Sequence, residues 1–537
     1  MAPCCSGGRR PRWLYGRMPL GTQRRFYTPR RVLAPEDVGI TEFLTPDLRG
    51  FRVQLRQRKR DFQVRELLPG GEALRLRAPL WTRGLARAAA AAATGEAAKS
   101  WPAERPDFLH FSLYQEGLGT QEALAVIARS VGRSAGQFLV AGSKDRRAVS
   151  VQQACIYRLR RSELLQAVLH PAWDTRVRIA DIEYHAHPLR LGGLAGNRFS
   201  LALRGDPGDS EELCSFEGQA ALEARMAALG NNGFLNYFGL QRFGTQRISA
   251  HHVGAALLRC EWQRAVCLIL GDAVDLLPTA CRSALGVGGS SVAPDNTLHD
   301  LRKLPQRYFR ERVLLCGLVQ GLTAEQALRR LPWSTLFLYM NAAQSIVFNF
   351  VLSKRVREFG PQPVAGDLLM PPNPPVTSAG AAPAVVAPGA ALAPAPLSAS
   401  EAVALQGEGL TRLALPLPGS KVQYPPHLQN AYAAAAEELL DLPLSIFSAG
   451  GGRIAELQGA MRAMAVRPAD LSWRICLPAE VTQRGNRLLL TDVDRIYADR
   501  AELPKWTPPA LSRDQEHAAL LLECSLPAAA YVTMAVR

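Results

Sequence analysis

The chain has 537 residues, more than one compact core accommodates, so we expect two or three domains. Hydrophobic residues make up 47% and charged residues 20%, a composition that argues against a mostly disordered chain. Lys and Arg number 63 against 47 Asp and Glu, and the net charge of +16 favours a polyanionic partner, nucleic acid before an anionic membrane. No stretch approaches eighteen uninterrupted apolar residues, so we expect no membrane span and no membrane partner.

The cysteines and histidines show no metal-binding pattern. None of the ten cysteines forms a C-x-x-C pair, and the nine histidines give no H-E-x-x-H motif. A structural zinc site and a disulfide scaffold are therefore not expected. We expect free thiols in a reducing compartment.

Residues 1–34 hold eight arginines and no acidic residue, with apolar residues interleaved. This composition is typical of a mitochondrial transit peptide, so we expect residues 1–35 to direct the protein to the mitochondrial matrix. The alternative is a disordered basic arm that contacts nucleic acid, on a protein of the nucleus or cytoplasm. Without these arginines the charge is still +8 (16 − 8), so the nucleic-acid inference does not depend on the leader.

The N-terminal half mixes strands with a helix. The expected strands are residues 51–55, 62–67, 138–141 and 198–204. A helix over 120–131 is expected to begin at a Thr120 cap. In the last of these strands Phe199, Leu201 and Leu203 alternate and should point inward.

The middle of the chain is helical in pattern and its end is strand-like. The expected helices are residues 220–229, 247–258, 264–270 and 340–355. The expected terminal strands are residues 518–526 and 531–536. Two low-complexity stretches, an Ala-rich run over 86–98 and a Pro/Ala/Gly-rich run over 371–400, are expected to be flexible loops. A sheet divided between the two ends of the chain implies a helical domain inserted between them.

The segment over 141–152 carries one carboxylate, Asp145, among the cations Lys144, Arg146 and Arg147. These neighbours favour the ionised carboxylate and also suit phosphate oxygens. The loop could therefore bind an RNA backbone and present an acid to a nucleotide. A charge cluster at a turn is more often simply solvated, and both interpretations stand on this segment alone.

Two further segments, residues 190–199 and 233–244, combine Asn, Arg, aromatic residues and glycines. Such side chains can bind a nucleobase by stacking and edge hydrogen bonds. The alternative, core aromatics beside turn glycines, is favoured for most of them by composition alone. Phosphate-binding G-x-G-x-x-G and P-loop motifs are absent, as is a recognisable Ser or Cys nucleophile motif.

Together these segments resemble the TruD family of RNA pseudouridine synthases. The motifs that carry the resemblance are D-F-x-V-x-E at 61–66, A-G-x-K-D-x-x-A-V around Asp145, L-G-x-L-x-G-N-x-F at 191–199, N-Y-F-G-x-Q-R-F-G at 236–244, Q-S-x-x-F-N at 344–349 and L-P-G at 417–419. With a terminal match at Leu526-Pro527, Tyr531-Val532-Thr533 and Arg537, they occur in the family's order and cover the chain from about residue 38 to residue 537. Six ordered motifs make a coincidence very improbable.

The resemblance implies the isomerisation of uridine to pseudouridine in RNA, with tRNA the leading substrate. The reaction breaks the N1–C1′ bond, turns the uracil and rejoins it through C5, which requires no metal ion and no other cofactor. It requires a carboxylate near C1′ of a uridine flipped out of its stack. The family's catalytic aspartate falls on Asp145, which would attack C1′ as a nucleophile or remove the C2′ proton as a base.

The resemblance also implies a set of substrate-binding residues. The aromatic that stacks on the target uracil falls on Phe199, and its partner asparagine falls on Asn197. We expect Lys144 and Arg146 to contact the RNA beside Asp145. Arg56 stands where the family usually has lysine; it preserves the charge and can bind a carboxylate bidentately, but the two side chains are not equivalent.

Three further residues are expected to support the site. Glu66 belongs to the first motif, and its role is either structural or indirect. Asn236 and Arg242 lie in the motif that we expect at a domain junction.

The implied fold class is α+β. A pseudouridine-synthase catalytic domain with a mixed sheet would comprise residues 40–235 and 475–537, interrupted by a mostly helical TruD-type insertion domain over 236–474 that includes the 371–400 loop. The two would meet across a basic cleft for RNA, in a protein that we expect to be a monomer.

Two rival functions remain open. One is a catalytically silent RNA-binding or ribosome-assembly factor of the same fold, against which the presence of Asp145, Asn197 and Phe199 argues. The other is a nucleic-acid hydrolase that uses Mg²⁺, but this would need several clustered acids, and the motifs supply only Asp145 and, more distantly, Glu66.

Overall fold

The computed structural model describes residues 33–48, 50–77, 100–205, 207–244, 249–271, 308–370, 385–386, 394–448, 456–484, 487–499 and 517–537. The chain forms two compact units. The helical unit comprises residues 1–38, 240–347 and 435–456, and the sheet unit comprises residues 39–239, 348–434 and 457–537. The predicted leader over 1–35 lies almost wholly outside the described residues, and the Ala-rich run over 86–98 wholly outside them. The predicted domain boundaries at 236 and 474 stay a prediction.

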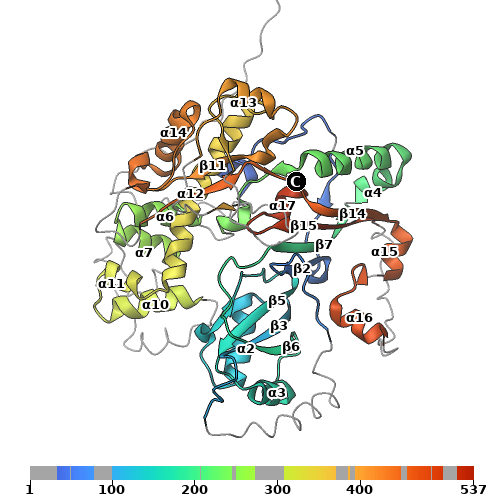
Figure 1. The fold of residues 1–537 in the computed structure, drawn as a ribbon, viewed down its shortest axis with the longest axis vertical. Helices are drawn as coiled ribbons and strands as arrows, with labels where there is room; N and C mark the ends of the chain where they lie inside the picture. Colours follow the sequence, from blue (N-terminus) through green and yellow to red (C-terminus); the bar gives the residue numbers. More distant parts are fainter. Residues whose placement is uncertain are drawn as a thin grey trace, which may run out of the picture. The chain divides into compact units, whose positions relative to one another are not determined.

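A nine-stranded mixed sheet dominates the sheet unit, with the main order β14-β15-β7-β2-β5-β3-β6. The strands are β1 (Val53–Gln54), β2 (Phe62–Leu67), β3 (Phe108–Glu116), β4 (Phe138–Val140), β5 (Val149–Tyr157), β6 (Val177–His185), β7 (Gly196–Gly205), β14 (Ala469–Cys476) and β15 (Ala519–Pro527). Strand β1 pairs with β7 and β4 with β5; β2 and β5 run parallel, whereas β15 and β7 run antiparallel. The C-terminal strands thus complete a sheet begun by the N-terminal half, as predicted (Figure 1).

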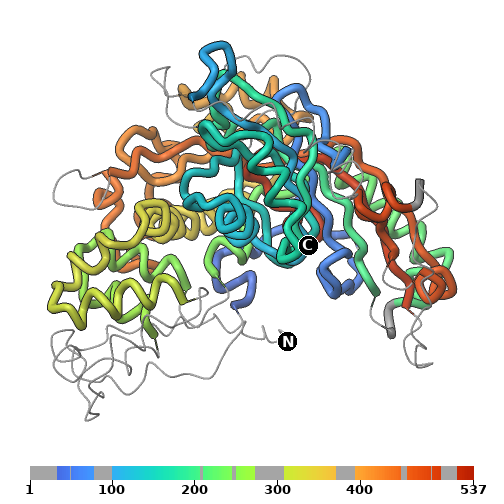
Figure 2. The backbone as a smooth tube through the Cα atoms, turned by 90° about the horizontal axis from the view of Figure 1, so that it is seen from below, coloured from blue at the N-terminus to red at the C-terminus, as the bar shows by residue number. Residues whose placement is uncertain are grey.

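Figure 2 follows the same arrangement along the backbone tube, where the red C-terminal segment runs beside blue and green strands of the N-terminal half. The α+β fold class predicted from the sequence is confirmed by these strands and the helices around them.

Strands β2 and β7 give the centre of the sheet two different faces. Their register places Phe62 opposite Leu201 and Val64 opposite Phe199, and these four side chains belong to one buried cluster. Because side chains alternate along a strand, the residues between them point the other way. We call the first set the apolar face and the second set the polar face; the polar face comprises Gln63, Arg65, Arg198 and Ser200.

Helix α2 (Thr120–Ser130) forms as the sequence predicted and packs on the sheet through apolar residues at helical spacing. Ala123, Leu124 and Ile127 are buried in the cluster that includes Leu113 of β3. The cap is different from the prediction: Gly119 has the extended N-cap conformation, and its N–H donates to Glu122 Oε2 at 2.9 Å. Thr120 is the first helical residue, so its hydroxyl is directed elsewhere.

The other helices of the sheet unit are α3 (Arg161–Leu169), α4 (Pro207–Cys214), α5 (Phe216–Asn232), α13 (Ala399–Ala404), α15 (Pro478–Arg484), α16 (Asp492–Asp499) and α17 (Val532–Ala535). Helix α17 corrects the prediction of a strand over 531–536. Pro527 is the last residue paired in β15, and Ala529 adopts φ +65°, which turns the chain away from the sheet. The β-branched residues that suggested a strand therefore form a short helix instead.

A four-stranded sheet lies within the region expected to be mostly helical. Its order is β10-β12-β11-β9, formed by β9 (Leu368–Leu369), β10 (Val385–Val386), β11 (Leu413–Leu417) and β12 (Ala460–Ala463). Strand β10 and the start of α13 fall inside the 371–400 run, so part of this expected flexible loop has regular structure. Residues 371–384 and 387–393 lie outside the described part. A further pair joins β8 (Phe234–Leu235) to β13 (Ala465–Val466).

The helical unit contains α6 (Ala250–Leu258), α7 (Trp262–Leu270), α10 (Phe309–Val319) and α11 (Ala324–Arg329), with the first part of α12 (Trp333–Phe359) and the end of α14 (Gln429–Leu440). Helices α6 and α12 approach closely, because a Cβ at Gly254 would overlap the carbonyl of Tyr339. A glycine is therefore required at this crossing.

Helix α12 is long and apolar enough to cross a membrane by length and composition, and 72% of its most apolar window is buried within the protein. The search for eighteen uninterrupted apolar residues did not detect this helix because Asn341, Gln344 and Ser345 interrupt its apolar run. One such helix in the described part of the chain is weak evidence for a span, because a buried core helix has the same length and composition.

Candidate active site

Asp145 lies in the loop between β4 and β5, at the apolar face of the sheet unit. Two backbone hydrogen bonds anchor the loop at its ends: Gly192 N donates to Ala141 O at 2.8 Å, and Gly117 N donates to Ala148 O at 3.0 Å. Ala141 and Ala148 are buried, whereas the Asp145 side chain remains 43% exposed. A firmly anchored loop therefore presents an accessible carboxylate.

Arg56 contacts this carboxylate directly. Its Nη2 donates to Asp145 Oδ2 at 2.5 Å, and only 16% of the Arg56 side chain is exposed. The guanidinium carbon also lies 3.9 Å from the centroid of the Phe62 ring, a cation–π contact. The arginine that stands in place of the family's lysine thus binds the acid and an aromatic ring at once.

The backbone at Arg56 is strained. Its φ of +60° lies in the left-handed region, which a residue with a Cβ adopts at a cost of about 1–3 kcal/mol. Arg147 Nη2 donates to the Arg56 carbonyl at 2.9 Å and helps to fix this conformation. Strain of this kind persists where surrounding contacts over-determine the geometry, and here those contacts aim the guanidinium at Asp145.

The Lys144 side chain points into the protein, whereas the Asp145 side chain is accessible from outside. Its Nζ lies 2.9 Å from Glu66 Oε2 and 2.9 Å from Asn197 Oδ1. The Lys144 and Glu66 side chains are 4% and 2% exposed. Glu66 and Asn197 face each other across β2 and β7, so the ammonium joins the ends of two central strands. The predicted contact of Lys144 with RNA has no support in this geometry, because the buried ammonium is already bound to two protein oxygens.

Phe199 is also buried, with 7% of its surface exposed, and meets Phe62 edge to face at 6.0 Å between ring centroids. The inward orientation predicted for Phe199, Leu201 and Leu203 is confirmed, since all three are buried. Little of the Phe199 ring face is open, so a uracil that stacks on it would require neighbouring side chains to move.

The three other predicted site residues make contacts of their own. Arg146 is exposed and lies 3.5 Å from Glu122. Asn236 is fully buried; its amide donates to Ala463 O at 3.0 Å and its Oδ1 accepts from Arg462 Nη2 at 2.8 Å, which ties β8 to the end of β12. Arg242 belongs to the helical unit, where its Nε donates to Ser345 Oγ at 3.2 Å.

Two buried residues beneath the loop, Thr120 and Gln152, were not predicted to belong to the site. Thr120 Oγ1 accepts hydrogen bonds from Lys144 N at 2.8 Å and from Gln152 Nε2 at 3.0 Å, and both Thr120 and Gln152 are buried. The hydroxyl that suggested a helix cap therefore supports the residue next to Asp145. The only signal in the sequence was a Thr at the start of a helix, which capping explains equally well.

Comparison with known proteins places the chain in a family. The family described as tRNA pseudouridine synthase D (TruD) matches residues 37–490. The chain belongs to the TruD family. Among curated relatives, a human pseudouridylate synthase 7 homolog is 29% identical over 448 residues, which cover 82% of this chain and 59% of the relative. The fission yeast multisubstrate pseudouridine synthase 7 (Schizosaccharomyces pombe) is 29% identical over 453 residues, covering 82% of this chain and 62% of the relative.

A solved structure shows the same fold. The crystal structure of a TruD protein from Methanosarcina mazei covers 94% of this chain and 96% of its own, with a TM-score of 0.52 and 19% sequence identity. The chain spans about three fifths of the length of the curated relatives named above. The TruD resemblance predicted from the ordered motifs is confirmed, and so is the fold.

The TruD motif residues around Asp145 form one connected group in the sheet unit. Arg56 and Phe62 lie on one side of the carboxylate, and Lys144, Glu66 and Asn197 lie beneath the loop. Within the described residues no group of three or more His, Cys, Asp or Glu side chains is placed to bind a metal ion. The chemistry available in this TruD site is that of one exposed carboxylate bound to a guanidinium.

Proposed function

We propose that the protein is an RNA pseudouridine synthase in which Asp145 acts on a flipped-out uridine, with tRNA as its first substrate. The observation that carries the proposal is the accessible Asp145 carboxylate at 2.5 Å from Arg56. Membership of a family described as tRNA pseudouridine synthase D supports both the reaction and the substrate. The yeast relative's description as multisubstrate makes other RNAs natural further targets.

The proposed reaction balances without an added reactant. The N1–C1′ bond of uridine breaks, the uracil turns within the site, C5 bonds to C1′, and the proton on C5 is finally lost while N1 gains one. An ionised Asp145 either bonds to C1′ and is later displaced, or removes the C2′ proton and returns it. Both routes require a charged oxygen close to the ribose, and Arg56 holds the Asp145 carboxylate in place by an ion pair.

The proposal assigns separate duties to the other contacts. Arg56 orients the Asp145 carboxylate. The Thr120 hydroxyl, which accepts from the Lys144 amide, and the Lys144 side chain, which binds Glu66, hold the loop against the sheet. Phe199 and Asn197 stay candidates for contact with the uracil, reached after a rearrangement around the buried ring. The hydrolase alternative loses support, because Glu66 is already bound to Lys144.

The purified full-length protein should release tritium from tRNA that carries [5-³H]uridine, because formation of the C5–C1′ bond expels the hydrogen at C5. Chemical mapping of the same RNA should locate pseudouridine at defined positions. Binding of tRNA, rRNA and mRNA transcripts with no tritium release from any of them would favour the silent RNA-binding factor and contradict the proposal.

Thr120→Val should lower kcat about 10- to 100-fold while the affinity for RNA changes little, because the loop that carries Asp145 loses its support. The valine leaves the Lys144 amide and the Gln152 side chain without their buried acceptor, at about 1–3 kcal/mol each. Thr120→Ser preserves the hydroxyl and is the matched control. Equal kcat values for the two variants would show that this hydroxyl does not position Asp145.

A further inference from the structure

A cavity of about 580 Å³ opens beside the polar face of the sheet unit. Its wall includes four arginines, Arg75, Arg77, Arg198 and Arg495, with Leu76 and Ile496 as apolar lining. A volume of this size falls within the range of small-molecule sites, about 300–1,000 Å³. It is large enough for a nucleotide.

Two of the four arginines are neutralised by neighbouring acids. Arg77 lies 2.5 Å from Glu72, and Arg198 lies 3.2 Å from Glu523. Burial acts to raise the pKa of Glu523, but hydrogen bonds from Ser200 and Arg198 outweigh it and lower this pKa, so the acid is ionised at neutral pH. Arg75 and Arg495 make no ion pair with any residue in the described ranges. They supply two positive charges to a wall that also carries Glu72 and Asp492, each of which is already paired with another arginine.

Buried contacts fix the segments that carry these two arginines. Asp492, at the start of α16, accepts from Arg65 Nη2 at 2.6 Å and from Leu76 N at 2.9 Å, so it joins the segment around Arg75 to the helix that carries Arg495. Leu76 and Ile496 belong to one apolar cluster. Arg75 and Arg495 are therefore held on a common frame.

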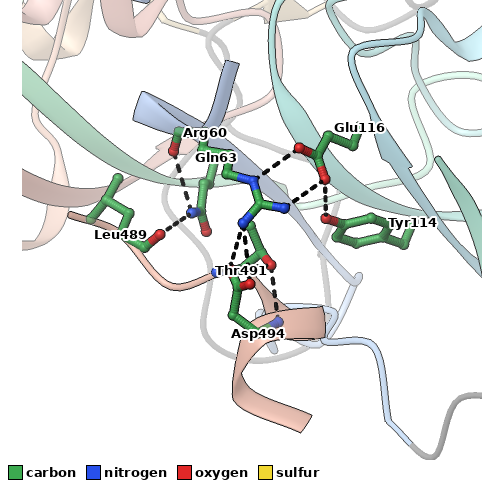
Figure 3. A network of polar contacts seen from close by, with 7 residues as sticks. All are labelled: Arg60, Gln63, Tyr114, Glu116, Leu489, Thr491 and Asp494. Atoms are coloured by element: carbon green, nitrogen blue, oxygen red, sulfur yellow. Dashed lines mark hydrogen bonds and ion pairs between the residues drawn. The ribbon is translucent and has the colours of Figure 1, made fainter. Parts of the chain in front are cut away.

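A second network fixes α16 to the sheet (Figure 3). Arg60 Nη1 lies 3.1 Å from Asp494 of α16, and Arg60 Nε lies 3.0 Å from Glu116 of β3. Burial acts to lower the pKa of Arg60, but the hydrogen bonds and charges of Glu116 and Asp494 outweigh it, and the pKa lies above its ordinary value. Arg60, which bridges α16 and β3, therefore stays protonated at neutral pH.

The cavity lies beside the polar face of β2 and β7, whereas Asp145 lies on the apolar face, where its partner Arg56 stacks on Phe62 at the start of β2. Arg198 lines the cavity, and the adjoining residues Asn197 and Phe199 point to the apolar face, where Asn197 meets Lys144. Leu74 N donates to Glu66 O at 2.8 Å, so the segment before Arg75 begins at this strand end.

We propose that this cavity binds a backbone phosphate of the RNA substrate through Arg75 and Arg495, away from the uridine at Asp145. The inference rests on the proposed function for its ligand, and it adds a contact with a part of the RNA remote from the reacting base. Paired exposed arginines without acidic partners suit phosphate oxygens, which they bind by charge-assisted hydrogen bonds.

The test is the salt dependence of RNA binding by the full-length Arg75→Ala/Arg495→Ala variant. Each lost phosphate contact lowers the slope of log K against log salt by about 0.9, so the loss of this one phosphate should lower the slope for full-length tRNA by about 1 and raise Kd at about 0.1 M salt about tenfold. A short single-stranded oligonucleotide around the target uridine should bind equally to the variant and the wild type. The value of kcat at saturating tRNA should not change.

The matched control is Arg161→Ala/Arg330→Ala, which removes two exposed arginines from α3 and from the residue after α11. An unchanged salt slope in the Arg75/Arg495 variant, or a loss equal to that of the control, would overturn the proposal. Tritium release by the wild type separates the two hypotheses: its absence counts against the proposed function, whereas its presence together with an unchanged slope counts only against this cavity.

Discussion

Asp145→Asn should reduce tritium release from [5-³H]uridine tRNA by at least about a thousandfold, with RNA affinity within about threefold of the wild type. The amide has the shape of the carboxylate but carries no charge, so it can neither attack C1′ nor remove the C2′ proton. It can still accept a hydrogen bond from Arg56 across the 2.5 Å contact. The fold and the cationic surroundings therefore persist while the reacting group is lost.

Asp107→Asn is the matched control for this experiment. Asp107 is also partly exposed, at 38%, and is also bound by an arginine, Arg158, at 2.6 Å in the same unit. It lies on the opposite end of the β3–β5 ladder from Val149, the first residue of β5 after the Asp145 loop. Near-normal turnover by Asp107→Asn is expected. Near-normal turnover by Asp145→Asn would remove Asp145 from the mechanism.

The repeating elements of the sheet unit were predictable because burial imposes a period on them. In β7 the alternation of Phe199, Leu201 and Leu203 predicts which side faces the core, and their burial agrees. In α2 the helical spacing of Leu124 and Ile127 predicts the packed face in the same way. Such patterns are local, so they can be recognised in one chain.

The end of the chain could not be predicted by the same means. Tyr531, Val532 and Thr533 have strand propensity, yet they follow Pro527, which cannot donate a ladder hydrogen bond, and Ala529, which turns the chain at φ +65°. The conformation of these three residues therefore depends on the turn that precedes them rather than on their own strand propensity. The pairing of β10 with β12 is similar, because it joins residues 385–386 to residues 461–462 across a long stretch of sequence.

Around Asp145 the sequence predicted the group but not the direction of each side chain. The loop from Ala141 to Ala148 has no period, so nothing local shows that Lys144 turns inward while Asp145 stays accessible. That difference depends on Glu66, which lies 78 residues away along the chain. For the same reason the support from Thr120 could not be distinguished from a helix cap.

Glu66→Gln should lower the thermal unfolding midpoint of the sheet unit by about 5–15 °C, because it leaves the Lys144 ammonium without a counter-charge in a nearly dry site. Lys144 and Glu66 are 4% and 2% exposed, and breaking a buried pair from one side costs about 3–5 kcal/mol. The midpoint, with hydrogen exchange at β2, is the suitable measure, since a chain of two units need not unfold in one step. Glu72→Gln, which breaks the exposed pair with Arg77, is the control and should have almost no effect.

The double variant Glu66→Gln/Lys144→Met distinguishes a charge effect from a packing effect. With both charges removed, the cost of an unpaired buried ion disappears, so the double variant should be more stable than Glu66→Gln alone. Additive losses would instead mean that the two side chains contribute by shape and hydrogen bonding rather than as an ion pair. In either case pseudouridine formation should fall in Glu66→Gln, in Lys144→Met and in the double variant, because Lys144 precedes Asp145 in the chain and joins the loop to the ends of β2 and β7.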